Sequence, residues 1–204
     1  MKVRRELLAI ALLLTTSVSG LGNVSLEEKR NRLRNLQPEA RKINLSPLER
    51  AYLDSITLLR QPGACGEFFG GRDAQDPLEE MVIRIREQRL DDRRMSVRMF
   101  GSFAYFTSAE KSVAYRVFPD VELNKVGPFY KSKAFPAEPF VAHVGYFRPN
   151  TRGARILILL HELAHLIKGA DGAWLIPDDG HSPELSRQNT FTVDSKCGKQ
   201  IRAL

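Results

Sequence analysis

The sequence has no internal repeat, no low-complexity tract and no apolar run long enough to span a bilayer permanently. Its formal net charge is +7 over 204 residues, yet no run of lysine and arginine is interleaved with aromatic residues. We therefore attribute the positive charge to solvation, with a weak preference for acidic partners, and expect no nucleic-acid partner and no stable membrane anchor. Cysteine is scarce as well, with only Cys65 and Cys197.

The first 20 residues follow the pattern of a secretory signal peptide. Lys2, Arg4 and Arg5 precede an apolar stretch over residues 7–14, and small residues lead up to Gly20. We therefore expect a secreted or periplasmic protein. The chain that remains after cleavage, of about 184 residues, is long enough for one domain with a hydrophobic core.

The two cysteines predict a disulfide, because an even pair in an exported protein is normally oxidised. Closing a loop of about 130 residues would contribute roughly 4–5 kcal/mol in the chain-entropy model. The alternative is that Cys65 or Cys197 is a zinc ligand. Thiolate ligation suits a structural zinc site better than one that activates water.

Three pairs of residues predict helix starts, because each places an N-cap residue before a proline at the first helical position. These pairs are Ser46-Pro47, Asp76-Pro77 and Ser182-Pro183. The predicted helices cover about residues 47–59, 77–85 and 184–197. Residues 62–71 are expected to form a turn around an aromatic pair, and residues 25–42 a polar helix or a partly ordered arm.

Between residues 95 and 147 the pattern changes to short alternating runs broken by glycine and proline, which is typical of strands. The predicted strands cover residues 103–106, 113–118, 129–130 and 141–147. Helices, then strands, then further helices indicate the α+β class with a small, mainly antiparallel sheet. We expect a signal peptide at 1–20, a polar N-terminal arm at 21–45 and one domain at 46–204.

Residues 161–165 have the sequence His-Glu-Leu-Ala-His and lie in an apolar run with helical spacing. On a helix, His161 and His165 lie about 40° apart around the axis and one turn apart along it, so both imidazoles can bind one metal ion. Glu162 lies beside them, where it can take a proton from a zinc-bound water. The alternative is two core histidines that form hydrogen bonds with other groups, although their neighbours in the sequence are apolar.

A catalytic zinc usually has three protein ligands, so a third ligand is needed. The chain after the helix offers five candidates, namely Asp171, Asp178, Asp179, His181 and Glu184. Asp171 also fits an Asp-Gly turn, and Glu184 lies in the first turn of a predicted helix, where the helix dipole favours a carboxylate. A lone histidine in a polar loop, such as His181, is commonly solvated. Sequence spacing alone leaves these alternatives open.

From Cys65 to Cys197 the chain resembles a group of exported bacterial proteins that share a set of short motifs. The matching segments are Cys65, Phe68-Phe69, Gly127-Pro128-Phe129, residues 159–165, Pro177-x-Asp179, Ser186-x-x-Asn189-Thr190 and Cys197. That group is similar to the aspzincins, zincin peptidases with the HExxH motif whose third ligand is an aspartate in the loop after the helix. Their GTxxD-type motif is missing here.

The resemblance implies a zincin-like catalytic domain over residues 46–204, with N-terminal helices, an active-site helix at the HExxH motif and a C-terminal helix. It also implies Asp179 as the third ligand of Zn²⁺, and it leaves Asp178 to accept a hydrogen bond from the Nδ1–H of a histidine ligand. Zincins generally place a substrate-binding edge strand near the active helix. The nearest candidate is the predicted strand 141–147, in which His143 or Tyr146 would stabilise an oxyanion, unless both simply face solvent.

The predicted function is zinc-dependent hydrolysis by a secreted or periplasmic metallopeptidase that acts on a peptide or protein. His161, His165 and Asp179 would hold the zinc, and Glu162 would be the general base. Two alternatives stay open. One is a non-catalytic exported domain that binds zinc, and the other is a hydrolase of a non-peptide amide.

Overall fold

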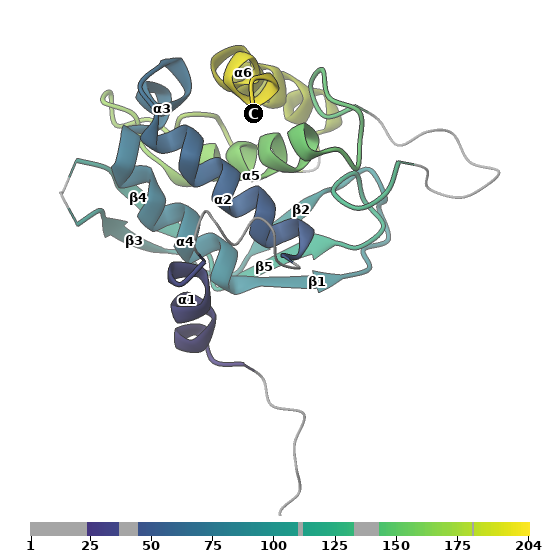
Figure 1. The fold of residues 1–204 in the computed structure, drawn as a ribbon, viewed down its shortest axis with the longest axis horizontal. Coiled ribbons are helices and arrows are strands. Elements are labelled where there is room, and N and C mark those ends of the chain that lie inside the picture. Colours follow the sequence, from purple (N-terminus) through teal and green to yellow (C-terminus); the bar gives the residue numbers. More distant parts are fainter. Residues whose placement is uncertain (1–23, 37–44, 110–111, 133–142, 181) are drawn as a thin grey trace, which may run out of the picture.

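Helices and short strands make up the part of the chain that the computed structural model describes, which is residues 24–36, 45–109, 112–132, 143–180 and 182–204. The predicted α+β class is confirmed. In chain order the elements are α1 (Leu26–Arg34), α2 (Pro47–Arg60), α3 (Ala64–Phe69), the 3-10 helix η2 (Gly71–Ala74), α4 (Gln75–Arg84), β1 (Ile85–Gln88), β2 (Val97–Phe100), β3 (Ala104–Thr107), β4 (Ala114–Val117), β5 (Asp120–Asn124), α5 (Arg152–Leu166) and α6 (Pro183–Arg202). Figure 1 shows their arrangement.

Helix α5 lies near the middle of the fold and packs against α2, α4 and α6 (Figure 1). Its N-cap is Thr151, whose side chain accepts a hydrogen bond from the Ala154 N–H. Residues 156–160 are all buried, so this part of the helix is apolar around its whole circumference. Full burial of each leucine or isoleucine contributes about 1.5–3 kcal/mol, and these contacts fix the position of the helix.

The strands form two small sheets rather than one. In the first sheet, β5 lies between β1 and β2, parallel to β1 and antiparallel to β2. In the second, β3 and β4 form an antiparallel hairpin. Strands β1, β2 and β5 were not predicted from the sequence. Exposed charged residues such as Arg86 and Arg98 interrupt the apolar pattern of the two outer strands of the first sheet.

Two of the three predicted helix starts are confirmed. Ser46 forms a capping box with Glu49 at the start of α2, and Ser182 accepts a hydrogen bond from the Leu185 N–H at the start of α6. Helix α6 continues to Arg202, beyond the predicted end.

The predicted helix start at Asp76 was wrong. Helix α4 begins at Gln75, two residues before the predicted first helical residue Pro77, and the Asp76 carboxylate instead accepts a hydrogen bond from the Ala109 N–H at 3.1 Å. The helix also ends before its predicted end at residue 85, because Ile85 pairs with Val121 as the first residue of β1. Strand pairing therefore overrides the apolar helical pattern at the C-terminal end of this segment.

Residues 62–71 contain a helix rather than the predicted turn. Helix α3 is only six residues long, which is too short to show a helical period in the sequence. It ends at Gly70, whose φ of 86° lies in the left-handed region that glycine adopts without strain. The aromatic pair in this segment, Phe68 and Phe69, packs edge to face with ring centroids 5.0 Å apart.

Two of the predicted strands are not strands where the structure describes them. Residues 129–130 lie in a turn in which the Tyr130 N–H donates to the Gly127 carbonyl. Residues 143–147 form a tight turn closed by two hydrogen bonds between Val144 and Phe147. Residues 141 and 142 lie outside the described residues. The prediction of a substrate-binding edge strand at 141–147 was therefore wrong for the described residues 143–147.

The predicted disulfide is confirmed between Cys65 on α3 and Cys197 on α6, and both residues are buried. The two cysteines are 132 residues apart in the sequence. The Cys65 N–H also donates to the Gln200 side-chain oxygen at 3.0 Å. These contacts fix the C-terminal half of α6 against α3 and exclude both sulfur atoms as zinc ligands.

Within the predicted N-terminal arm, α1 is a polar helix that packs on α4 through ion pairs. Arg30 lies 2.7 Å from a carboxylate oxygen of Glu80, and Arg34 lies 2.9 Å from one of Glu79. The predicted signal peptide at 1–20 lies outside the described residues. None of the described helices combines the length and the apolar character needed to cross a membrane.

Candidate metal centre

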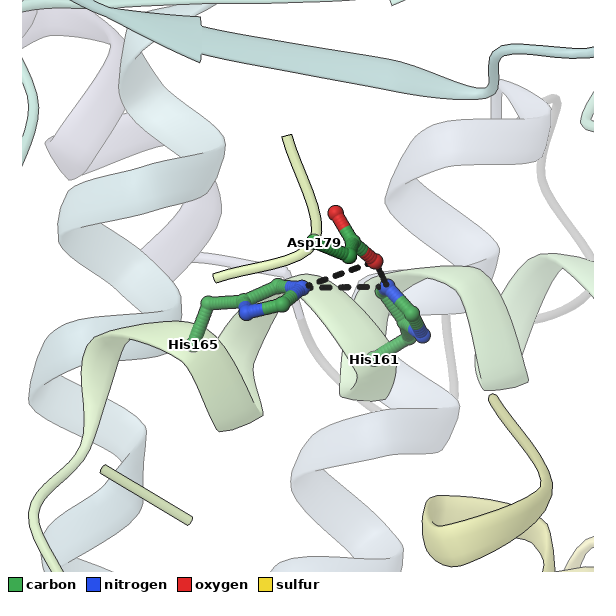
Figure 2. A group of neighbouring side chains, drawn as sticks. All are labelled: His161, His165 and Asp179. Carbon is green, nitrogen blue, oxygen red and sulfur yellow. Dashed lines mark hydrogen bonds and ion pairs between the residues drawn. The ribbon is translucent and has the colours of Figure 1, made fainter. Parts of the chain in front are cut away.

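Three donor atoms from α5 and from the loop before α6 converge on one point (Figure 2). The Nε2 atoms of His161 and His165 lie 3.1 Å apart. The Oδ2 atom of Asp179 lies 3.3 Å from the first nitrogen and 3.5 Å from the second. Over the described residues, this is the one group of three or more histidine, cysteine and carboxylate donors close enough to hold a metal ion.

The dimensions of this triangle suit a zinc ion. Tetrahedral zinc with bonds of about 2.0–2.1 Å places its ligand atoms about 3.3–3.4 Å from one another. The three observed separations, 3.1, 3.3 and 3.5 Å, lie around that value. Two imidazole nitrogens and one carboxylate oxygen are also a donor set that zinc accepts. The residues therefore fit zinc without rearrangement.

Helix α5 positions both histidines through its own geometry, since they lie one turn apart on the same face. His161 is 7% exposed and His165 is 4% exposed, because the surrounding residues of α5 are apolar and buried. Burial lowers the pKa of His161, although its contact with the negative charge of Asp179 opposes that shift. The imidazole is therefore held in the neutral form that binds metal ions.

The pKa values of the two acidic residues near the centre are shifted in opposite directions. Burial by itself would raise the pKa of Asp179, but its contacts with His161 and His165 lower the pKa overall, so that the residue is a carboxylate. Glu162 is half-buried, and burial followed by the negative charge of Asp179 raises its pKa well above the usual range. A cation held at the centre would oppose this second shift, because positive charge favours the carboxylate form.

Two residues of α6 that the sequence analysis quoted without a role contact the donor triangle. The Thr190 hydroxyl donates to the Ser186 carbonyl at 2.8 Å, so its oxygen accepts from the His161 Nδ1–H at 3.1 Å. This hydrogen bond leaves the His161 Nε2 lone pair facing the centre. The buried Asn189 amide donates to the Pro177 carbonyl at 2.8 Å and, at 3.4 Å, to the Asp179 Oδ2.

Asp178 does not join the triangle, because it pairs with Arg116. Its Oδ2 accepts from Arg116 Nη1 at 3.1 Å, and its Oδ1 accepts from Arg116 Nη2. The same Oδ1 lies 3.9 Å from His165 Nδ1, a buried nitrogen that has no hydrogen-bond partner in the described part of the chain. The carboxylate thus lies beside His165, but the hydrogen bond that the resemblance implied is not formed.

The remaining candidates for the third ligand lie elsewhere or cannot be placed. The Asp171 carboxylate accepts a hydrogen bond from the Ala173 N–H in the turn that the sequence suggested. Glu184 is fully exposed on α6 and pairs with Arg187 at 2.9 Å. His181 lies outside the described residues. Of the candidates that can be placed, only Asp179 belongs to the donor triangle.

The two residues suggested for oxyanion stabilisation do not contact the donor triangle in the structure. His143 is exposed at the start of its turn. Tyr146 is 74% exposed, and its ring packs edge to face on Phe191 of α6. Its backbone N–H donates to Asp194 at 3.0 Å. Both residues therefore match the alternative given above, in which their polar side chains face solvent.

No family model, no curated protein and no solved structure matches the chain. The zincin-like details of the predicted domain therefore stay a prediction. The functional assignment depends on the donor triangle, its burial and the residues around it.

Proposed function

We propose that this chain is an exported zinc-dependent hydrolase, and specifically a metallopeptidase that cleaves a peptide or protein substrate. The observation that supports the proposal is the triangle of two histidine nitrogens and one aspartate oxygen, 3.1–3.5 Å apart. Three protein ligands are the number that hydrolytic zinc sites use, because the fourth position is kept for water or substrate. The disulfide supports export, since such bonds persist in oxidising compartments.

Each residue of the centre has a separate role in the proposed reaction. When bound, zinc would act as a Lewis acid and lower the pKa of water to about 7. His161, His165 and Asp179 would hold the ion, and Thr190 would keep the His161 ring in the ligating tautomer. Glu162, next to His161 on α5, would accept the proton of the attacking water and pass it to the leaving amine.

The substitution Glu162→Gln tests the proposal, because glutamine has the shape of glutamate but cannot accept the proton. We expect the variant to keep its zinc and its thermal midpoint while hydrolysis falls by about 10²–10⁴-fold. The substrate is a fluorescence-quenched peptide library, and the matched control is Glu184→Gln on the exposed face of α6. Both variants are purified identically, so that a contaminating peptidase would appear equally in each.

The outcomes separate the proposed function from its alternatives. Equal hydrolysis by wild type, Glu162→Gln and Glu184→Gln would contradict the metallopeptidase proposal. Wild-type protein that binds zinc, cleaves no peptide and cleaves non-peptide amides would support the second class of hydrolase. Zinc binding without hydrolysis of either class would support a non-catalytic zinc-binding domain.

A further inference from the structure

Arg116 on β4 is a buried cation that contacts both α5 and the loop that carries Asp179. Its side chain is only 3% exposed. Its Nε donates to the His165 carbonyl at 3.0 Å, and its two terminal nitrogens donate to the two oxygens of Asp178. One guanidinium group therefore joins the last turn of α5 to the residue that precedes Asp179.

Aromatic rings hold the Arg116 side chain in this position. Its Cζ lies 4.2 Å from the ring centre of Trp174, 5.3 Å from that of Phe103 and 5.2 Å from that of Phe118. Such cation–π contacts favour a guanidinium group and exclude water from it. Asp178 supplies the counter-charge that a buried arginine needs.

The strand that carries Arg116 is itself fixed to the end of α5. The Lys168 N–H donates to the Ala114 carbonyl at 2.9 Å, and Tyr115 forms a bridge with Ile167. Backbone and side-chain contacts of β4 therefore reach the same end of the helix. This arrangement fixes the position of the guanidinium relative to the end of α5 that carries the two histidines.

We infer that Arg116 is a positioning residue for the metal centre, which holds the Asp179 loop against α5 before zinc binds. This inference rests on the proposed zinc site and extends it to a residue outside the three proposed ligands. A ligand on a free loop must lose conformational entropy when it binds, and a contact that orders the loop beforehand raises the affinity. Asp178 transmits the effect, because it is bonded to Arg116 and precedes Asp179 in the chain.

The geometry requires arginine rather than lysine at this position. The planar guanidinium presents several N–H groups in a fixed fork, which here bonds one backbone carbonyl and two carboxylate oxygens. The ammonium group of lysine is a point charge on a flexible stem and cannot hold the same set of acceptors in one orientation. Arg116→Lys therefore keeps the charge and removes the positioning.

The test is the zinc affinity of the full chain, measured by competition with a chromogenic chelator and compared with the thermal midpoint of the zinc-free protein. We expect Arg116→Lys to weaken zinc binding by about 10–100-fold, the range seen when partners of metal ligands are removed. Asp178→Asn should weaken binding similarly, and because that side chain is 63% exposed we expect the variant to fold. The double variant should bind zinc as tightly as the single variant with the lower affinity, because both changes break the same contact between Arg116 and Asp178.

Arg98→Lys is the matched control. Arg98 also donates two hydrogen bonds to a carboxylate, that of Glu122, and lies over an aromatic ring, but its side chain is 51% exposed and it belongs to the other sheet. The thermal midpoint of the zinc-free protein reports any loss of stability in each lysine variant, and weaker zinc binding should appear only in Arg116→Lys. Wild-type zinc affinity in both Arg116→Lys and Asp178→Asn would overturn the inference.

The readout separates this inference from the proposed function. A chain that binds zinc but hydrolyses nothing would contradict the hydrolase proposal, and the zinc affinities of the variants would still decide the role of Arg116. A wild-type chain that binds no zinc would contradict both.

Discussion

The two histidines and the aspartate of the candidate metal centre are positioned in different ways. His161 and His165 belong to a buried helix, and their separation follows from the helical repeat alone. Asp179 belongs to a loop whose neighbouring residue, Asp178, is 63% exposed. Contacts from β4 and α6, through Arg116 and Asn189, hold that loop in place.

The centre thus has a helical half, His161 and His165, and a loop half, Asp179. The two halves should be sensitive to different substitutions. The helical half depends on the geometry of α5 and on the burial of that helix, to which many residues contribute. The loop half depends on a few side chains from distant parts of the sequence. We therefore expect single substitutions outside the ligands to act on the loop half more strongly than on the helical half.

Removal of the disulfide should have the largest effect on stability and should act on both halves. Helix α6 contains Thr190, which contacts His161, and Asn189, which contacts Asp179. The disulfide of Cys197 bonds that helix to α3. The double variant Cys65→Ala/Cys197→Ala is expected to lose about 2–5 kcal/mol of unfolding free energy. Urea denaturation without reductant measures the change. An unaltered midpoint would show that the other contacts of α6 suffice to hold it.

Thr190→Val should have an intermediate effect, seen mainly in zinc binding. The change preserves the shape of the side chain but leaves the His161 Nδ1–H without its acceptor, so the ring is no longer fixed in the ligating tautomer. Zinc affinity is expected to fall by about 10-fold or more, as measured by chelator competition. The control is Thr192→Val, whose exposed hydroxyl donates only to the Gln188 carbonyl. Equal affinities in the two variants would mean that burial alone orients His161.

Thr151→Ala should have the smallest effect and should leave zinc binding unchanged. The residue caps α5 at the end remote from the histidines, where its hydroxyl accepts a hydrogen bond from the Ala154 N–H at 3.3 Å. Loss of an N-cap costs about 1 kcal/mol of stability. Thermal unfolding measures that loss, and chelator competition measures the zinc affinity. A weaker zinc affinity would show that the histidines depend on the whole length of α5.

The same contrast explains how much of the molecule the sequence could predict. The starts of α2 and α6 and the histidine helix were predictable, because caps and helical spacing are local signals. The strands β1, β2 and β5 were not, because short strands are stabilised by pairing with residues far along the chain. Segment 62–71 contains a helix of six residues, which was not predictable because it is shorter than two helical turns.

The loop half of the centre was the less predictable half. Spacing left five candidates for the third ligand, and of those that the structure describes only Asp179 belongs to the donor triangle with the two histidines. The role of Arg116 had one local signal, a charged residue inside the apolar run 113–118. Its partners, the His165 carbonyl and Asp178, lie 49 and 62 residues away in the sequence, so no local pattern could identify them.

The zinc content of Asp179→Ala, compared with that of Glu184→Ala, tests the central claim most directly. Metal analysis of the purified proteins after dialysis should find close to one zinc per chain in wild type and in Glu184→Ala, because the three donors form a prearranged site. Asp179→Ala and His161→Ala should retain almost none. Zinc retained in Asp179→Ala but lost from Glu184→Ala would contradict the assignment and identify the helix carboxylate as the third ligand.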